Sequence, residues 1–518
     1  RQEIKARLAE LASDPVEIPV IVGGKEIRTG KTCQAVMPHN HGHVLATWHK
    51  AGPAEVTQAI EAAARAHREW AAWPWEDRAA VLLKAAELLA RPWRPTVNGA
   101  TMLCQSKTVH QAEIDAACEL IDFYRFNAHF TERLYQDQPL SVDGAWNRLD
   151  YRPLEGFVFA VTPFNFTSIA GNLPTAPALM GNTVVWKPAS ATVYTGYYLM
   201  RLLEAAGLPP GVINFVPGDA GPVSQVALHH PDLAGIHFTG STGVFQTMWR
   251  TVGENISRYK SYPRLVGETG GKDFIVAHPS ADRDALLTAI VRGGFEYQGQ
   301  KCSAVSRVYV PDSLWKGLKD DVVARTAELT MGDVADFRNF LGAVIDQKSF
   351  EKITSYIEDA RRSSDAEILV GGESDDSTGY FIRPTIIHAR RPDYRTMCEE
   401  IFGPVVTVYV YPEKEWAETL HLVNTTSPYA LTGAVFATDR RALREADAAL
   451  RYAAGNYYVN DKPTGAVVGQ QPFGGARASG TNDKAGSMLN LVRWVSARTI
   501  KENFSPPKDY RYPFMGEE

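Results

Sequence analysis

Cysteine is scarce in this chain, which has five in 518 residues, at positions 33, 104, 118, 302 and 398. The number is odd and the spacings are wide, which argues against a disulfide framework and fits a reducing compartment. No two cysteines form a Cys-x-x-Cys pair, so a structural zinc site is not expected. We therefore predict a protein without a bound metal.

Long apolar runs and an excess of basic charge are also missing. The sequence has no run of apolar residues of the length, about 18 or more, that a membrane-spanning helix requires. The formal net charge of −5 offers no basic field for nucleic acid or anionic lipid. The composition, 45% hydrophobic and 22% charged, is typical of a globular protein with several domains and a large core.

What the sequence does contain is a regular alternation of apolar strands and helices. Four short apolar segments are separated by helical stretches, at residues 157–161, 183–188, 212–216 and 235–239. This pattern predicts a parallel, doubly wound sheet, in which ligands bind at the carboxyl ends of the strands. A second α/β pattern has apolar segments at residues 273–277, 308–310, 405–409 and 433–436. No Gly/Ser-rich linker separates the two patterns, so we expect two closely packed α/β domains.

Helical periodicity dominates the segment before these strands. Apolar residues recur at helical spacing in two stretches between Ala54 and Ala90, and again from about Gln111 to Phe130. Glu119 lies in a largely apolar part of the third stretch. An acid at such a position needs a partner or a function, because burial of an unpaired charge is costly.

One cysteine stands among small and polar neighbours, in the segment FEYQGQKCS at residues 295–303. Gly299 lets the backbone approach a ligand closely, and a thiolate at Cys302 would be a strong nucleophile if a base took its proton. The nearest candidate base is Glu268, between an apolar run and two glycines, where burial can raise a carboxyl pKa. Taken singly, Cys302 can also be a buried apolar side chain and Glu268 a solvated loop acid.

Together the two segments resemble the signatures of the NAD(P)-dependent aldehyde dehydrogenase superfamily, and the resemblance covers nearly the whole chain. In that family Phe-x-x-x-Gly-Gln-x-Cys carries the nucleophile, here Cys302, and Glu-x-Gly-Gly-Lys carries the general base, here Glu268. The segment TPFNF at residues 162–166 resembles a third family motif, whose asparagine, here Asn165, donates to the oxyanion. Without the resemblance, Asn165 can equally be a turn residue at a strand end. The resemblance implies an aldehyde dehydrogenase-like α/β fold and these three catalytic residues.

The Rossmann fingerprint Gly-x-Gly-x-x-Gly is absent, and its nearest counterpart is FTGSTG at residues 238–243. That segment offers glycines and hydroxyls at a helix N-terminus, where a pyrophosphate can bind. Hydride transfer requires a nicotinamide cofactor, and the resemblance implies NAD. Many NAD-specific members have an acid where this chain has Ser190, so we expect NADP to be less strongly excluded. The implied cofactor residues are Thr162, Phe164, Lys187, Ser190, Gly218, Gly221, Gly240, Ser241, Thr242, Gly243, Glu400 and Phe402.

Further residues resemble the branch of the family that oxidises L-glutamate γ-semialdehyde to L-glutamate, the second step of proline breakdown. There the hydroxyl after the nucleophile, here Ser303, and the amides of Gly465 and Ala466 bind the substrate α-carboxylate. Some members have serine at the position of Ala466, and that side-chain bond would be missing here.

The resemblance also implies which residues contact the remaining groups of the substrate. Phe166 and Phe473 would enclose the aliphatic chain, Glu119 would face the α-ammonium, and Lys301 completes the expected substrate-binding set. Such a pocket would reject simple alkanals, because its buried polar groups would lose their partners.

The resemblance divides the chain into an NAD-binding domain (1–137 and 155–273), a catalytic domain (274–485) and a small β element (138–154 and 486–518). The β element would join subunits in a homodimer or larger homo-oligomer. The location would be the cytoplasm of a bacterium or the mitochondrial matrix of a eukaryote.

Three alternatives stay open. The first is the same chemistry on another semialdehyde, such as 2-aminoadipate or succinate semialdehyde. The second is a CoA-acylating dehydrogenase, against which the retained Glu268 argues. The third is a non-catalytic binding or structural protein on this scaffold, against which the intact Cys302, Glu268 and Asn165 argue.

Overall fold

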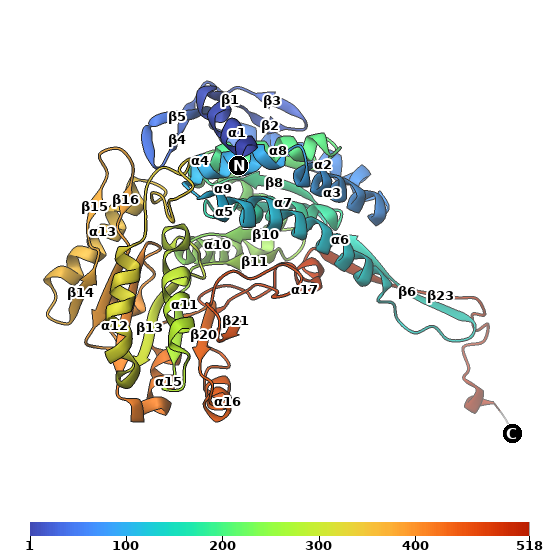
Figure 1. The fold of residues 1–518 in the computed structure, drawn as a ribbon. Coiled ribbons are helices and arrows are strands. Elements are labelled where there is room, and N and C mark those ends of the chain that lie inside the picture. The colour runs from blue at the N-terminus through green and yellow to red at the C-terminus, as the bar shows by residue number, and fades with distance from the viewer. Residues whose placement is uncertain (517–518) are drawn as a thin grey trace.

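The first of two large sheets has seven strands in the order β11-β10-β7-β8-β9-β2-β3. The computed structural model describes residues 1–516. Neighbouring strands from β11 to β9 are parallel, and the hairpin β2–β3 adds an antiparallel edge (Figure 1). The strands are β2 Val20–Val22, β3 Lys25–Ile27, β7 Phe157–Val161, β8 Thr183–Lys187, β9 Ile213–Phe215, β10 Leu233–Thr239 and β11 Arg264–Glu268.

Helices cover both faces of this sheet, because successive side chains of each strand point to opposite sides. Val158 and Ala160 pack with α3, α4, α6, α7 and α8, whereas Phe157 and Phe159 pack with α2, α9 and α10. The predicted doubly wound sheet is confirmed. The helices are α2 Pro53–Trp70, α3 Trp75–Ala90, α4 Arg94–Gln105, α6 Leu120–Gln136, α7 Thr167–Leu179, α8 Val193–Ala205, α9 Ala220–His229 and α10 Thr242–Glu254.

The helical stretch expected from Gln111 to Phe130 is not a uniform α-helix. It begins with α5, Val109–Ala112, continues as a π-helix over Glu113–Glu119, and becomes α-helical in α6. The apolar spacing does not separate these forms, because a few residues of π-helix keep much the same buried face. π-Helical turns are frequent at functional sites, and Glu119 is the last residue of this one.

The second large sheet, of order β14-β17-β18-β13-β12-β20-β21, is parallel except at β14. Its strands are β12 Asp273–Ala277, β13 Val305–Pro311, β14 Ala366–Val370, β17 Thr385–Ala389, β18 Val405–Tyr411, β20 Thr432–Phe436 and β21 Asn456–Val459. Two apolar clusters cover its faces. The helices around it are α11 Arg283–Phe295, α12 Asp312–Ala327, α13 Gln347–Arg362, α14 Arg395–Cys398, α15 Trp416–Thr425 and α16 Arg440–Ala449.

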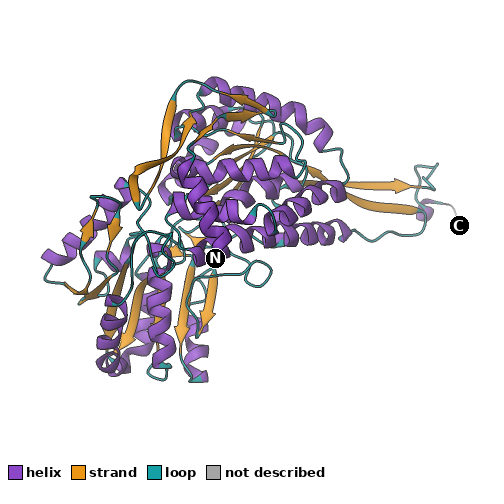
Figure 2. Ribbon diagram, turned by 45° about the horizontal axis from the view of Figure 1, so that its top comes forward, coloured by secondary structure: helices purple, strands orange, loops and turns teal. Residues whose placement is uncertain are grey.

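Smaller elements complete the molecule. A two-stranded arm, β6 with β23, projects far from the body (Figures 1 and 2). The bounds are α1 Gln2–Ser13, β1 Val16–Ile18, β4 Thr32–Met37, β5 Asn40–His49, β6 Ala145–Pro153, β15 Ser374–Asp375, β16 Phe381–Ile382, β19 Tyr429–Ala430, β22 Ala476–Arg477, α17 Met488–Val492 and β23 Val495–Asn503. Among residues 1–516, no helix combines the length and apolarity needed to cross a membrane.

The two large sheets are joined by a short link. β11 ends at Glu268 and β12 begins at Asp273, so residues 269–272 are all that separates them in sequence. The carboxyl end of the first sheet therefore lies close to the start of the second. The domain boundaries set out above stay a prediction.

Candidate active site

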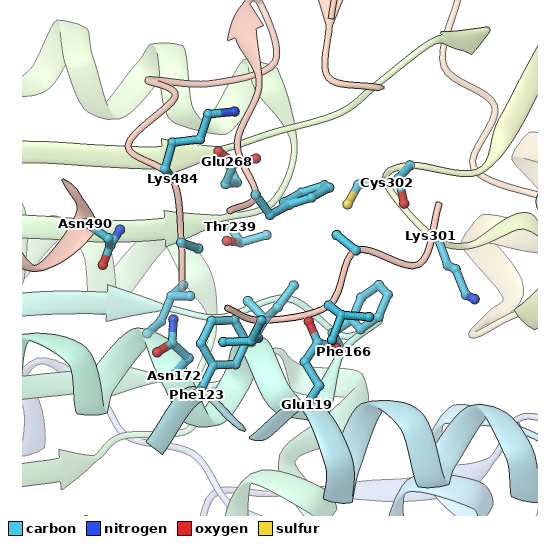
Figure 3. A pocket seen from close by; sticks show the side chains of 18 of the residues that line it. Glu119, Phe123, Phe166, Asn172, Thr239, Glu268, Lys301, Cys302, Lys484 and Asn490 are labelled. Carbon is cyan, nitrogen blue, oxygen red and sulfur yellow. The ribbon is translucent and has the colours of Figure 1, made fainter. Parts of the chain in front are cut away.

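A cavity of about 320 Å³ lies at this junction and brings together residues from both halves of the chain. Figure 3 shows Cys302 and Glu268 at one side of it, with Glu119 and Phe166 at another. Its lining includes nine predicted residues, namely Glu119, Phe166, Glu268, Lys301, Cys302, Ser303, Gly465, Ala466 and Phe473.

The loop that carries Cys302 is held in a strained conformation. Tyr297 and Gln298 have φ of 51° and 55°, in the left-handed region. At Gly299, a Cβ atom would lie 2.2 Å from the Gly403 carbonyl oxygen, so no other residue fits there. The Gln298 amide donates to two distant backbone carbonyls at 3.0 and 2.8 Å. These constraints fix the position of the sulfur.

Burial raises the pKa of the Cys302 thiol well above its usual range, and the carboxyl groups of Asp273 and Glu268 add to the rise. The resting group is therefore a thiol rather than a thiolate. A nucleophile in this state needs a base within reach to remove its proton.

Glu268 is suited to that task. One carboxyl oxygen, Oε1, accepts from the Gly475 N–H at 3.3 Å. The other, Oε2, is buried and has no hydrogen-bond partner in the described chain. Burial raises the pKa of Glu268 well above 4.5, while the Gly475 N–H and Lys484 oppose the rise. A carboxyl with a raised pKa and an unused oxygen in a cavity is suited to accept and return a proton.

Asn165 follows β7 and is buried beside the nucleophile loop. Its amide Nδ2 donates to the Gln300 carbonyl oxygen at 3.0 Å. An amide carries two N–H donors, so one remains for another acceptor. Asn165 thus lies close to Cys302 in space, and its role as oxyanion donor stays a prediction.

The expected carboxylate-binding end of the cavity is rich in donors. The Ser303 and Thr464 hydroxyls are 2.8 Å apart, and Gly465 has φ of 93°. Lys462 donates to the Thr464 carbonyl oxygen at 2.8 Å. Lys301 differs from the rest, because its ammonium points away from the cavity and pairs with Glu296 at 2.9 Å. Lys301 still lines the cavity wall, and its place among the substrate-binding residues stays a prediction.

Glu119 faces the cavity from the last turn of the π-helix. Its Oε2 accepts from the Ser168 hydroxyl at 3.0 Å. Burial is the main cause, and the nearby Asp115 carboxylate the second, of the rise in the pKa of Glu119 to about 8. The side chain can therefore be a neutral acid in the empty pocket and a carboxylate when a cation is bound.

The expected cofactor residues lie at the carboxyl edge of the first sheet. Lys187 ends β8, is 5% exposed and donates to the Pro188 carbonyl at 3.1 Å, and burial lowers its pKa to about 8. Ser241 and Thr242 lie at the N-terminus of α10. An ammonium and hydroxyls at a helix N-terminus fit ribose and pyrophosphate groups.

The residues expected to bind the nicotinamide end of the cofactor lie next to the nucleophile. Glu400 accepts from the Gly271 N–H at 2.9 Å, and the rings of Phe402 and Phe164 meet edge to face at 5.7 Å. A small cavity of about 20 Å³ is lined by Glu400, Phe402 and Cys302. These residues could hold the nicotinamide end of a dinucleotide, and Cys302 lines the same small cavity.

Comparison with known proteins decides the family. Residues 26–500 match the profile of the aldehyde dehydrogenase family. The chain belongs to the aldehyde dehydrogenase family. It is 52% identical to "Delta-1-pyrroline-5-carboxylate dehydrogenase, mitochondrial" of Dictyostelium discoideum, over 99% of this chain and 93% of the relative.

Solved structures of family members are similar over the whole chain. The Δ-pyrroline-5-carboxylate dehydrogenase of Mycobacterium tuberculosis bound with NAD has a TM-score of 0.96 and 56% identity, covering 100% of this chain and 96% of that one. The 1-pyrroline-5-carboxylate dehydrogenase from Thermus with bound NAD has a TM-score of 0.91 and 33% identity, covering 97% and 96%. The aldehyde dehydrogenase fold is thereby confirmed.

Within this aldehyde dehydrogenase, several cavity residues were not predicted from the sequence. Phe123, Asn172, Thr464 and Lys484 line the cavity. Asp115 and Lys107 lie behind it as a buried ion pair. The signal that singled out Glu119, an acid in an apolar helix, applies equally to Asp115, whereas Lys484 follows from no pattern in the sequence. Four of the predicted cofactor residues, Ser190, Gly221, Ser241 and Gly243, are exposed at the sheet edge.

Proposed function

We propose that this aldehyde dehydrogenase oxidises L-glutamate γ-semialdehyde, formed from Δ1-pyrroline-5-carboxylate, to L-glutamate with NAD, as the second step of proline catabolism. The observation that carries the proposal is one cavity with a thiol and a base at one side and an acid, Glu119, at another. Relatives that match nearly the full chain are named for this dehydrogenase activity.

The catalytic residues act in sequence. The Cys302 sulfur attacks the aldehyde carbon after Glu268 takes the thiol proton, and Asn165 with the Cys302 N–H stabilises the oxyanion. When bound, NAD supplies the acceptor for the hydride that leaves this carbon. The thioester that remains on Cys302 is hydrolysed by a water from which Glu268 removes a proton. The product is the second carboxylate of L-glutamate.

The cavity wall supplies specificity by binding the two charged groups of an amino acid. Ser303 and the backbone amides of Gly465 and Ala466 bind the α-carboxylate, because a hydroxyl and N–H groups are suited to an anion. Glu119 faces the α-ammonium, and Phe166 and Phe473 enclose the aliphatic chain. Ala466 offers its amide without a side-chain donor.

A second copy of the chain completes the proposed assembly. The arm formed by β6 and β23 exposes apolar side chains that a monomer would leave in water, at Leu140, Trp146 and Phe504. We infer a homodimer, or a larger homo-oligomer, through this arm, with residues 138–154 and 486–518 as the assembly element. Since the relative from Dictyostelium discoideum is named mitochondrial, we infer the mitochondrial matrix for a eukaryotic chain and the cytoplasm for a bacterial one.

Substrate preference tests the proposal. NADH formation is followed at equal concentrations of pyrroline-5-carboxylate, succinate semialdehyde and propanal. We expect kcat/KM for pyrroline-5-carboxylate to exceed the others by about a hundredfold, near 2.7 kcal/mol. Comparable rates on all three would keep the dehydrogenase chemistry and reject the substrate assignment.

A further inference from the structure

Lys484 lies beside Glu268 on the cavity wall, and the mechanism above does not use it (Figure 3). Its ammonium donates to the carbonyl oxygens of Gly455 at 2.7 Å and Gly474 at 3.3 Å. A third, longer bond reaches Asn456 Oδ1 at 3.4 Å. An ammonium has three donors, and all three are used within the protein. Lys484 is therefore built into the structure rather than left for a ligand.

These bonds hold the turn that contacts the general base. Asn456 Oδ1 also accepts from the Gly474 N–H at 3.1 Å. The next N–H along the chain, that of Gly475, donates to Glu268 Oε1 at 3.3 Å. Lys484 and Asn456 thus tie the turn to β21 and orient the donor that meets the base.

The same turn carries a wall of the substrate cavity. Phe473 and Ala485, the neighbour of Lys484, exchange two backbone hydrogen bonds at 3.1 and 2.8 Å. Thr481 N–H donates to the Gly267 carbonyl oxygen at 2.9 Å, directly before Glu268. One segment, residues 473–485, therefore surrounds the base and presents Phe473.

The charges around Glu268 have different signs. Lys484 favours its carboxylate form, whereas Asp483 disfavours it. Asp483 is itself paired with Arg493 at 3.3 Å. The His237 ring also lines the cavity, but burial lowers its pKa to about 4, so it is neutral near pH 7. Lys484 is thus the cation that borders the base directly.

We propose that Lys484 is a positioning residue for thioester hydrolysis: its hydrogen bonds hold the Gly475 N–H on Glu268, and its positive charge favours the carboxylate that activates water. The proposal rests on the role of Glu268 in the proposed function. It predicts two separable effects, one on the geometry of the turn and one on the charge of the base.

The test uses 4-nitrophenyl acetate with the full chain. This activated ester acylates a nucleophilic thiol without a cofactor, so the burst of 4-nitrophenolate reports acylation and the steady rate reports hydrolysis of the acyl-enzyme. The steady rate is measured from pH 5 to 9 for the wild type and for Lys484→Gln, Lys484→Arg and Asn456→Ala. Thermal unfolding of each variant reports whether the fold is retained.

The steady rate should fall at acidic pH, where Glu268 is protonated, and we call this part of the pH profile the acidic limb. We expect Lys484→Gln to shift the acidic limb to higher pH by about one unit, because loss of an adjacent positive charge disfavours the carboxylate. Lys484→Arg keeps the charge and should restore the wild-type limb. Asn456→Ala loosens the turn without changing the charge. It should raise KM for pyrroline-5-carboxylate through Phe473 and move the limb less than Lys484→Gln does, because it weakens only the bond from the Gly475 N–H.

Two results would overturn the proposal. The first is an acidic limb for Lys484→Gln at the same pH as in the wild type. The second is a shift of the acidic limb in Asn456→Ala as large as that in Lys484→Gln, which would mean that Lys484 acts only by holding the turn in place. If Lys484→Gln does not fold, Lys484→Met, which matches the apolar stem, takes its place under the same criteria.

The ester carries neither a carboxylate nor an ammonium, so the pH dependence of its hydrolysis is independent of the substrate assignment. Wild-type ester turnover without oxidation of pyrroline-5-carboxylate would reject the proposed substrate alone. A wild type that releases no 4-nitrophenolate, in a burst or at a steady rate, would overturn this proposal as well, since Glu268 would then have no acyl-enzyme to hydrolyse.

Discussion

The Lys107 ammonium lies 2.5 Å from the Asp115 carboxylate, and both side chains are 1% exposed. The carboxylate also accepts the N–H groups of Thr167 and Ser168, in the first turn of α7. The ammonium lies 4.4 Å from the centre of the Phe166 ring. This buried pair thus supports the cavity wall from behind.

Breaking the pair should cost stability. We expect Asp115→Ala to lower the free energy of unfolding by about 3–5 kcal/mol, because Lys107 is left buried without a partner. Lys107→Met should cost less, because Asp115 keeps its two N–H donors. Urea unfolding measures both. Glu445→Ala, which breaks the exposed pair with Arg441, is the control and should cost less than about 1 kcal/mol. Equal losses in all three variants would contradict this ranking.

Product binding should release a proton from Glu119. With a pKa of about 8, the carboxyl is mostly protonated at pH 7, and an α-ammonium beside it favours the ionised form. Calorimetry of L-glutamate binding at pH 7, in two buffers of different ionisation enthalpy, should give close to one proton released per site. The release should fade as the pH rises above about 8, where Glu119 is already ionised.

Glu119→Gln is the matched control, because it keeps the shape and cannot release a proton. It should also raise KM for the amino-acid aldehyde far more than for propanal. Identical apparent heats in the two buffers for the wild type would remove Glu119 from the ammonium site.

Replacement of the nucleophile should separate chemistry from binding. Cys302→Ala should reduce NADH formation by on the order of 10⁴ or more, while NAD still quenches intrinsic fluorescence as in the wild type. Cys33→Ala, at an exposed cysteine on β4, should keep full activity. Retained turnover in Cys302→Ala would exclude this thiol as the nucleophile.

Replacement of the base should stop the reaction after hydride transfer. In Glu268→Gln we expect a slowed burst of about one NADH per site and then a still slower steady rate, because the thiol loses the base that takes its proton and the thioester lacks its water-activating base. Stopped-flow absorbance measures the burst, and mass spectrometry of the quenched protein should find the acyl group on Cys302. A steady rate equal to that of the wild type would leave Glu268 without a hydrolytic role.

Cofactor preference should respond to Ser190, which is exposed after β8. Ser190→Glu should lower kcat/KM for NADP by about tenfold, since one adjacent like charge at a surface costs roughly 1–2 kcal/mol. The NAD value should change little, because a carboxylate can accept from the ribose hydroxyls. Ser190→Ala is the neutral control, and an equal loss with both cofactors would place Ser190 outside the ribose site.

The sequence by itself determined the type of fold and the family. Apolar runs such as Phe157–Val161 predicted parallel strands, because a strand buried on both faces has no polar positions. The segments around Cys302 and Glu268 indicated the family, because a nucleophile loop needs its glycine and a base needs its strand end. Each of these requirements concerns a few neighbouring residues, so a short stretch of sequence is enough to recognise it.

Tertiary structure alone decided the environment of these groups. Lys484 meets Gly455 and Gly474 only because residues 473–485 fold back beside the start of β21, and no pattern along the chain marks such a contact. The raised pKa values of Glu268 and Glu119 likewise come from burial, which depends on every segment that packs over them. Lys301 lines the cavity while its ammonium pairs with Glu296, and no pattern in the sequence shows that pairing. Reactive groups are encoded locally, whereas their protonation and orientation arise from long-range packing.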